Sequence, residues 1–365
     1  MKYLSLFSGI GGFELGIIKA YEHLDNRGIT ETSALEERWD KSEPNPSDGN
    51  GRRANPTCIG YSEIDKYATQ IYEKHFPQHK ALGDITKLNV SELPDFDLLV
   101  GGFPCQAFSI AGKRRGFDDT RGTLFFDIAR ILKEKRPRNF ILENVKGLLS
   151  HDNGRTFKTI ISTLVELGYC VEWQILNAKN FGVPQNRERV FIVGHLGGIP
   201  ERKVFPIGYS DNKIDTEQLT STAIDSNYWK GIDNHGQRTS IVMKGMLSDE
   251  KWDKFNESSR RVYDPKGISP TLPTVAGGGH TPKIDVKEIE ETLALSGLEI
   301  TEKGYESLDN INKIRVRRLT PLECERLMGF EDRWCDGLSD TQKYKCLGNA
   351  VVSNVVEEVV KKLYV

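Results

Sequence analysis

Four side chains in this sequence could carry out group-transfer chemistry if the fold brings them together. Cys105 and Glu143 each follow an apolar segment that is typical of a buried strand. A thiolate is the nucleophilic form of cysteine, and a carboxyl group after a buried strand can have a raised pKa and donate a proton. Arg187 and Arg189 alternate, which places both on one face of a strand and suits phosphate binding or substrate orientation. Each residue also has a structural alternative: an inert buried cysteine, a capping acid or an ordinary ion pair.

A second set of residues could bind a nucleoside. The glycine-rich segment Phe7–Gly12 (FSGIGG) follows an apolar run and precedes a helical pattern, so its backbone could approach a ligand at a helix N-terminus. It lacks the Gly-Lys-Ser/Thr of a phosphate loop and the third glycine of a dinucleotide fingerprint. Glu63 ends the next strand pattern, where α/β folds bind ribose hydroxyls, and Asp84 follows another short strand. Either acid alone is typical of a helix cap, but their shared placement favours a ligand role.

Strand and helix patterns alternate through residues 1–197 and must position these side chains. The expected strands are Lys2–Phe7, Cys58–Ser62, Phe96–Gly101, Asn139–Glu143, Cys170–Leu176 and Arg189–Gly194. The expected helices are Phe13–Leu24, Lys66–His75, Leu124–Lys135 and Thr156–Leu167. Such alternation predicts a doubly wound α/β domain with a mostly parallel sheet covered by helices.

Three segments depart from the alternation. Residues 40–56 are rich in Pro, Gly, Asn and Asp, which predicts a loop insertion exposed to solvent. The segment Ala111–Thr123 carries four basic residues among glycines, and a loop closing over a polyanion and a solvated charge run are equally good interpretations. Residues 198–314 lose the alternation and predict a smaller, more irregular second domain. Helical patterns return at Pro321–Met328 and Ser353–Leu363.

Composition limits the classes of protein. A hydrophobic content of 38% with 28% charged residues and a net charge of -2 excludes a disordered polyelectrolyte. No apolar run approaches the roughly 18 residues of a membrane span, and the first apolar stretch, with its glycines and Glu14, is unlike a signal peptide. Six cysteines without a CxxC pair argue against a disulfide scaffold and against a zinc site, so we expect no metal. These features together favour a cytoplasmic protein without a membrane partner.

The motifs, in their order, resemble the DNA (cytosine-5) methyltransferases of bacterial restriction–modification systems. The glycine segment alone is unspecific, but the ordered motifs together are very specific. They span nearly the whole chain apart from its middle, and the insertion at 40–56 leaves them intact. The matching segments are Phe7–Gly12, Glu63, Asp84, Pro104–Cys105, Thr120–Leu124, Glu143–Val145, Gln185–Arg189, Arg318–Phe330 and Gly348–Val351.

The resemblance implies a fold and a cofactor. The fold would be the Rossmann-like mixed sheet of S-adenosylmethionine-dependent methyltransferases, with helices on both faces and a smaller target recognition domain. Residues 1–197 and 315–365 would form a discontinuous catalytic domain, and 198–314 the recognition domain. The residues expected to bind S-adenosylmethionine are Phe7, Gly9, Gly11, Gly12, Glu63, Asp84, Ile85, Pro104, Leu124 and Asn349.

The resemblance also implies a mechanism. Cys105 would add to C6 of a cytosine, and Glu143 would hydrogen-bond and protonate it around N3, so that C5 becomes a nucleophile. Arg189 would orient the base and Arg187 would support the site. The target lies inside double-stranded DNA and would be flipped out of the helix. A cognate restriction endonuclease is a possible partner in the same system, and a monomer is expected.

Within the expected recognition domain, Thr271–Leu272 and Gly277–Gly279 resemble segments that read base edges in the major groove. Arginines within this domain and directly after it would supply phosphate contacts: Arg260, Arg261, Arg315, Arg317 and Arg318.

Three alternatives remain open on the sequence. The same chemistry could act on RNA, although a large recognition domain fits duplex DNA better. The chain could be a binding module without activity, against which the intact Cys105, Glu143, Arg187 and Arg189 argue. A nucleotide-binding oxidoreductase would need a better dinucleotide fingerprint than Phe7–Gly12 offers.

Overall fold

A computed structural model of the chain describes residues 1–28, 55–104, 124–198, 200, 203–207, 243–246, 261–263, 269–270, 283–285 and 316–364. The chain divides into two compact units. The first comprises Met1–Leu176, Glu188–Gly208 and Ala350–Val365, and the second Asn177–Arg187 and Tyr209–Asn349. The functional boundaries expected at 197/198 and 314/315 stay predictions. Among the described residues, no helix combines the length and the apolar character that crossing a membrane requires.

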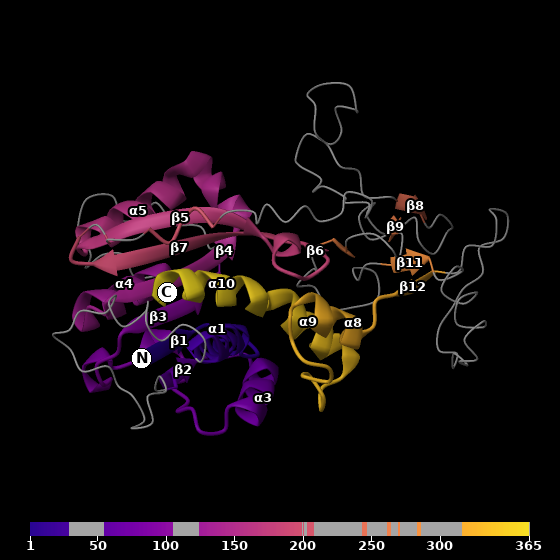
Figure 1. Cartoon of the computed structure of the whole chain (residues 1–365), viewed down its shortest axis with the longest axis horizontal. Helices are drawn as coiled ribbons and strands as arrows, with labels where there is room; N and C mark the ends of the chain where they lie inside the picture. Colours follow the sequence, from indigo (N-terminus) through magenta and orange to yellow (C-terminus); the bar gives the residue numbers. More distant parts are fainter. Residues whose placement is uncertain are drawn as a thin grey trace. The chain divides into compact units, whose positions relative to one another are not determined.

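A six-stranded sheet forms the centre of the first unit (Figure 1). In spatial order its strands are β2 (Thr57–Ser62), β1 (Lys2–Leu6), β3 (Leu98–Gly102), β4 (Asn139–Val145), β7 (Glu188–Leu196) and β5 (Tyr169–Asn177). The first four strands pair in parallel, whereas β7 runs antiparallel to β4. The carboxyl ends of β1, β2, β3 and β4 therefore share one edge with the amino end of β7. This confirms the mixed sheet.

One face of this sheet packs on α4 (Leu124–Lys135) and α5 (Arg155–Glu166). Leu4, Leu99 and Phe140 on the strands join the buried apolar residues of both helices in one cluster. Because side chains alternate along a strand, Tyr3 and Ser5 point to the opposite face, and both are buried there.

The opposite face is covered by α1 (Gly12–Gly28) and α10 (Ser353–Tyr364), which lie side by side (Figure 1). A Cβ atom at Gly16 would come within 2.6 Å of Val356 Cβ, so the two helices approach closely. Lys19 Nζ donates to Ser353 Oγ at 3.1 Å. The last helix of the chain thus completes the fold around the first. Helices on both faces are confirmed.

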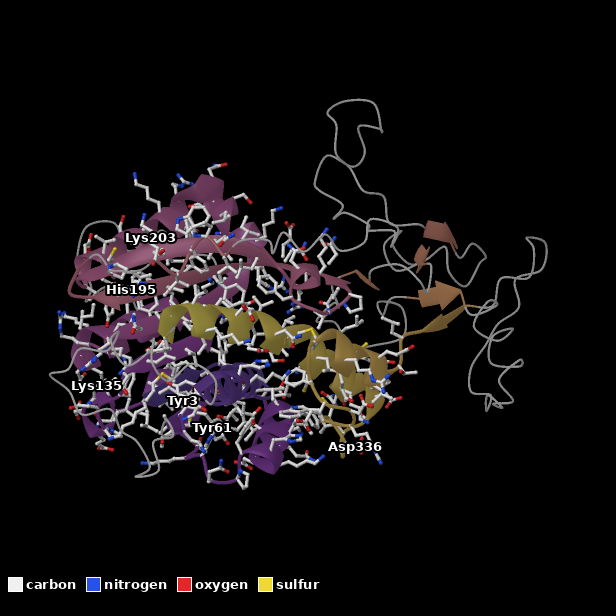
Figure 2. All side chains as sticks on the ribbon, viewed as in Figure 1. Tyr3, Tyr61, Lys135, His195, Lys203 and Asp336 are labelled. Carbon is white, nitrogen blue, oxygen red and sulfur yellow. The ribbon has the colours of Figure 1, made fainter. Side chains whose placement is uncertain are left out.

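A shorter helix, α3 (Lys66–His75), follows β2 and begins at the side chain of Asp65, which accepts hydrogen bonds from two backbone N–H groups of the first turn. Figure 2 labels Tyr3 on β1 and Tyr61 on β2. Tyr61 stacks on Tyr72 of α3 with ring centroids 3.9 Å apart.

The second unit contains short strands and two helices in its described residues. The strands β8 (Met243–Met246), β9 (Arg261–Tyr263), β11 (Lys283–Asp285) and β12 (Val316–Arg318) form a sheet of order β12-β11-β9-β8. A separate pair joins β6 (Gln185–Asn186) to β10 (Ser269–Pro270). The helices are α8 (Pro321–Leu327) and α9 (Asp340–Asn349).

The beginning of α8 is set by its sequence. Thr320 and Glu323 form a reciprocal capping box, with Pro321 in the first turn. Within α8, the buried carboxylate of Glu325 accepts hydrogen bonds from two backbone N–H groups that follow the helix, those of Arg333 at 2.8 Å and Cys335 at 2.9 Å. These bonds fix the segment between α8 and α9.

Candidate active site at the carboxyl ends of the strands

The glycine segment forms a tight turn between β1 and α1. Phe7, Gly9 and Gly11 all have positive φ angles, of 53°, 56° and 91°. A Cβ at Gly11 would lie 2.4 Å from the Phe76 ring, so that glycine is required for packing. A Cβ at Gly9 would meet no described atom within 4 Å. The backbone at Gly9 is therefore open to a ligand.

Glu63 bridges the glycine turn and the start of α3. One carboxylate oxygen accepts Gly9 N–H at 2.9 Å, and the other accepts the N–H groups of Ile64 and Asp65, both at 2.8 Å. This fixes the carboxylate in place, and oxygens of this kind can accept further bonds from hydroxyl groups. The expected ribose contact of Glu63 stays a prediction, but the geometry is suited to it.

Ile64 is a neighbour that the sequence analysis did not single out. Its side chain is 77% exposed, beside a carboxylate and a backbone turn that are held in place. An apolar side chain so exposed offers a contact surface for a flat apolar group. The sequence signal, an isoleucine directly after the acid, is too common to indicate this role.

Asp84 is held in the loop that precedes β3. Its carboxylate accepts Thr86 N–H at 3.0 Å and Thr86 Oγ1 at 2.8 Å, and these hydrogen bonds lower its pKa. It thereby caps the 3₁₀ turn Ile85–Lys87, which is the structural alternative to ligand binding. Ser62 Oγ donates to Gly83 O at 2.6 Å, which ties this loop to the end of β2.

Glu143 lies within β4, two residues before its end, and not directly after the strand. Its Oε1 is 2.9 Å from Nε of Arg189, and both side chains are largely buried, at 12% and 15% exposed. The antiparallel pairing of β4 with β7 brings them together, with Val145 opposite Arg189. A largely buried ion pair of this kind holds each side chain in one orientation.

Gly102 and Asn144 connect this ion pair to the end of β3. A Cβ at Gly102 would lie 3.2 Å from Glu143 Oε2 and 3.8 Å from the Phe13 ring, so a larger residue here would press on the Glu143 carboxylate. Asn144 Nδ2 donates to Phe103 O at 2.8 Å, one residue before Pro104. Cys105 lies outside the described residues, but the chain that leads to it is held directly beside Glu143.

Arg187 and Arg189 have different partners. Arg189 contacts Glu143, whereas Arg187 is 3% exposed and its Nη2 donates to Gly348 O at 3.1 Å within the second unit. Gln185 of the same segment donates to Leu327 O at 3.2 Å. In the described contacts, therefore, Arg187 links β6 to the end of α9. Its expected support of the reacting base stays a prediction.

Two further expected cofactor residues are described. Leu124 begins α4 and packs at the edge of the core, and Asn349 is the exposed last residue of α9. Their contacts with a cofactor stay predictions. The basic segment up to Thr123 and most of the insertion at 40–56 lie outside the described residues.

A buried acid lies directly behind the glycine turn and was not predicted. Glu14, in the first turn of α1, is 0% exposed. Tyr72 donates to its Oε1 at 2.9 Å and lies 3.0 Å from Nδ1 of His79, while Oε2 has no hydrogen-bond partner among the described residues. Burial raises the pKa of Glu14 to about 7, against an ordinary value of 4.5.

Comparison with known proteins identifies a family for this arrangement. Residues 48–365 match the model for C-5 cytosine-specific DNA methylases. The chain is 41% identical over 362 residues to the type II methyltransferase M.SsoII of Shigella sonnei, covering 99% of this chain and 79% of that protein. It is 54% identical over 389 residues to the type II methyltransferase M.NlaIV of Neisseria lactamica, covering 84% of this chain and 92% of that protein.

Solved structures agree at the level of the fold. The S. pombe Dnmt2 methyltransferase superposes with a TM-score of 0.60 at 18% identity, covering 99% of this chain and 97% of that one. At this identity the likeness supports only the common fold.

Proposed function

The chain belongs to the C-5 cytosine-specific DNA methylases and is a DNA (cytosine-5) methyltransferase of the type II restriction–modification class, and we propose that it methylates a flipped-out cytosine through a covalent Cys105 intermediate. The methyl donor would be S-adenosylmethionine. The main support is the placement of Glu63, Glu143 and Arg189 at one edge of the sheet, with the chain to Cys105 held beside them.

The residues at the glycine turn fit the proposed cofactor. The open backbone at Gly9 leaves room for the amino-acid portion, and the Glu63 carboxylate has the acceptors that ribose hydroxyls need. Ile64 offers an exposed apolar side chain to the adenine, with Asp84 and Ile85 in the neighbouring loop. S-adenosylmethionine supplies an electrophilic methyl group on sulfur.

Cys105 would begin the reaction by forming a carbon–sulfur bond at C6 of the cytosine. Glu143, in its protonated form, would donate a hydrogen bond and its proton to N3, which moves electron density to C5. C5 would then bond to the methyl group as the bond between that methyl group and sulfur breaks, which leaves S-adenosylhomocysteine. A base would then remove the C5 proton, the carbon–sulfur bond would break as the N3 proton returns to Glu143, and the thiolate would be regenerated. Arg189 holds Glu143 by their 2.9 Å contact and would also orient the base.

The five other cysteines are poorer candidates for the nucleophile. Cys324, Cys335 and Cys346 are buried, and Cys58 and Cys170 are half-buried. Burial raises the pKa of the Cys58 thiol to about 12, with a further rise from the charge of Glu14. Burial also raises the pKa of Cys324 and of Cys335. A thiolate is thus disfavoured at these three positions.

Residues 198–314 would form the target recognition domain and the rest of the chain the catalytic domain. The described strands there are short, and β9 carries Arg261. Its arginines, with those of β12, would contact phosphates, while loops read the base edges of double-stranded DNA. A cognate endonuclease, a monomeric state and a cytoplasmic location complete the proposal and remain predictions.

Cytosine-modification sequencing tests the function. The chain and its Cys105→Ala variant are expressed in a bacterial host that lacks cytosine methylation, and plasmid DNA is sequenced. We expect 5-methylcytosine at one short sequence, absent with the variant. An unmethylated plasmid with methylated transfer RNA would indicate the RNA activity instead. Neither product, from folded protein that binds DNA, would indicate a binding module.

A further inference from the structure

Arg130 on α4 is bound to the loop that carries Asp84. Its Nη1 donates to Leu88 O and its Nη2 donates to Ile85 O, both at 2.9 Å. Nη2 also donates to Asp127 Oδ1, at 3.1 Å on the same helix. One guanidinium group therefore holds two backbone carbonyls of the turn that Asp84 begins, and Asp127 holds the guanidinium.

The chemistry of arginine suits this contact. The guanidinium is planar and always charged, so it can donate two hydrogen bonds at once in a fixed geometry. A lysine has the charge but not the fork. Carbonyl groups at the end of a short 3₁₀ turn have few partners within the turn, because such a turn makes only one or two internal bonds. Ile85 O accepts Leu88 N–H within the turn, at 3.3 Å, and Arg130 adds a second hydrogen bond to this carbonyl and one to Leu88 O.

The turn is held from three directions. Ile85 is 3% exposed and packs in the core cluster, Ser62 holds the carbonyl of Gly83, and Arg130 holds the carbonyl end. Of these three, only Arg130 reaches past the first residue of the turn to Leu88. The Arg130 side chain is 39% exposed, so the two carbonyls could reach water if it were removed. Loss of Arg130 would therefore loosen this turn without leaving its two carbonyl groups buried and without hydrogen-bond partners.

We propose that Arg130 is a positioning residue for cofactor binding, which fixes the Asp84–Leu88 turn against the adenosine portion of S-adenosylmethionine. The proposal rests on the cofactor site described above. Arg130 does not touch the ligand itself; it keeps Asp84 and Ile85 in the conformation that binds it, so the turn need not be ordered on binding.

The test measures the dissociation constant of S-adenosylhomocysteine by calorimetry on the full chain. Arg130→Ala is expected to weaken binding about tenfold, the loss typical of removing charge-assisted hydrogen bonds that order a loop. Arg130→Lys should restore part of it and keeps the test available if the alanine variant folds poorly. Arg155→Ala is the matched control, because Arg155 also donates to a carbonyl of a 3₁₀ turn, that of Asp152, at 3.2 Å. It should bind normally.

A double-mutant cycle separates positioning from a general structural role. If Arg130 acts through the turn, Asp84→Ala and Arg130→Ala together should weaken binding by less than the product of their separate effects. Hydrogen exchange at Thr86–Leu88 should also rise in Arg130→Ala and fall again with ligand. Wild-type affinity in both Arg130 variants, or multiplicative effects in the cycle, would overturn the positioning role. A wild-type chain that binds no S-adenosylhomocysteine would instead overturn the cofactor site itself.

Discussion

Replacing Glu14 by glutamine should change the pH dependence of stability in the first unit. Burial raises the pKa of this carboxyl to about 7 from 4.5, and this effect outweighs the hydrogen bonds from Ser5 and from the phenol of Tyr72, which lower the pKa. In the folded protein the group therefore keeps its proton over a range where the unfolded chain has lost it. Stability must fall as the pH rises through this range, from 4.5 to about 7.

The magnitude follows from the two pKa values. Each pKa unit corresponds to about 1.4 kcal/mol, so ionised Glu14 lowers the free energy of unfolding by about 3 kcal/mol above pH 7. Most of that change, about 2 to 3 kcal/mol, falls between pH 5 and pH 8. The Glu14→Gln side chain cannot ionise, so its stability relative to the wild type should increase by this amount over the same interval.

Other groups around Glu14 do not produce the same signal. Burial and the charge of Glu14 raise the pKa of Tyr3 and Tyr72 far outside this interval, and that of Cys58 to about 12. Burial lowers the pKa of His79, which makes stability rise with pH, the opposite sign. Taking the difference between variant and wild type at each pH removes the contributions that the two proteins share.

The assay is urea unfolding, monitored by hydrogen exchange of peptides from β3 and β4. This probe reports the free energy of unfolding of the first unit alone. Glu22→Gln, an exposed glutamate on the same helix, controls for the loss of one surface charge. A stability difference between Glu14→Gln and wild type that is equal at pH 5 and pH 8 would refute the buried, protonated carboxyl.

Two further predictions concern the framework of the site. Gly11→Ala should destabilise the first unit by about 2 to 4 kcal/mol, because its Cβ would lie 2.4 Å from Phe76 at a φ of 91°. Gly9→Ala meets open space but places alanine at a φ of 56°, so it should cost about 1 to 2 kcal/mol, less than Gly11→Ala, and mainly weaken S-adenosylhomocysteine binding. A larger loss of stability in urea for Gly9→Ala than for Gly11→Ala, or wild-type affinity of Gly9→Ala by calorimetry, would contradict the assignment. Glu172→Ala should cost about 2 to 4 kcal/mol, because its carboxylate accepts His195 Nε2 at 3.0 Å and two backbone N–H groups at 3.1 and 3.2 Å. The exposed Glu166→Ala is its control in the same urea titration, and equal losses would show that these buried bonds contribute nothing.

Much of the first unit was predictable because local patterns dominate there. The helices Lys66–His75 and Leu124–Lys135 have the predicted limits, since the apolar spacing of both is regular and Asp65 caps the first of them. The strand directions were harder: an apolar run of β7 does not reveal that the strand runs antiparallel to β4. The helix Asp340–Asn349 was missed because its sequence is largely polar and has no clear apolar stripe.

In the candidate site too, residues set by a local pattern were predictable and contacts between distant parts of the chain were not. The place of Glu63 was predictable because the carboxyl end of β2 is a local feature of the sequence. The short strand expected before Asp84 is only an isolated bridge at Ala81, and Asp84 caps a 3₁₀ turn. The contacts of Arg130, Asn144 and Glu14 were not, because each joins residues more than 40 positions apart. Such contacts depend on how the layers pack, which no local pattern encodes.

Trapping of the covalent intermediate tests the central claim most directly. Once the methylated sequence is known, the protein is incubated with S-adenosylmethionine and a duplex that carries 5-fluorocytosine at the target position. Fluorine at C5 cannot leave as a proton, so the Cys105–C6 bond should persist, giving a denaturation-resistant adduct whose DNA is attached to the peptide containing Cys105. An enzyme that methylates the ordinary duplex yet forms no adduct, or forms it at another cysteine, would contradict the account.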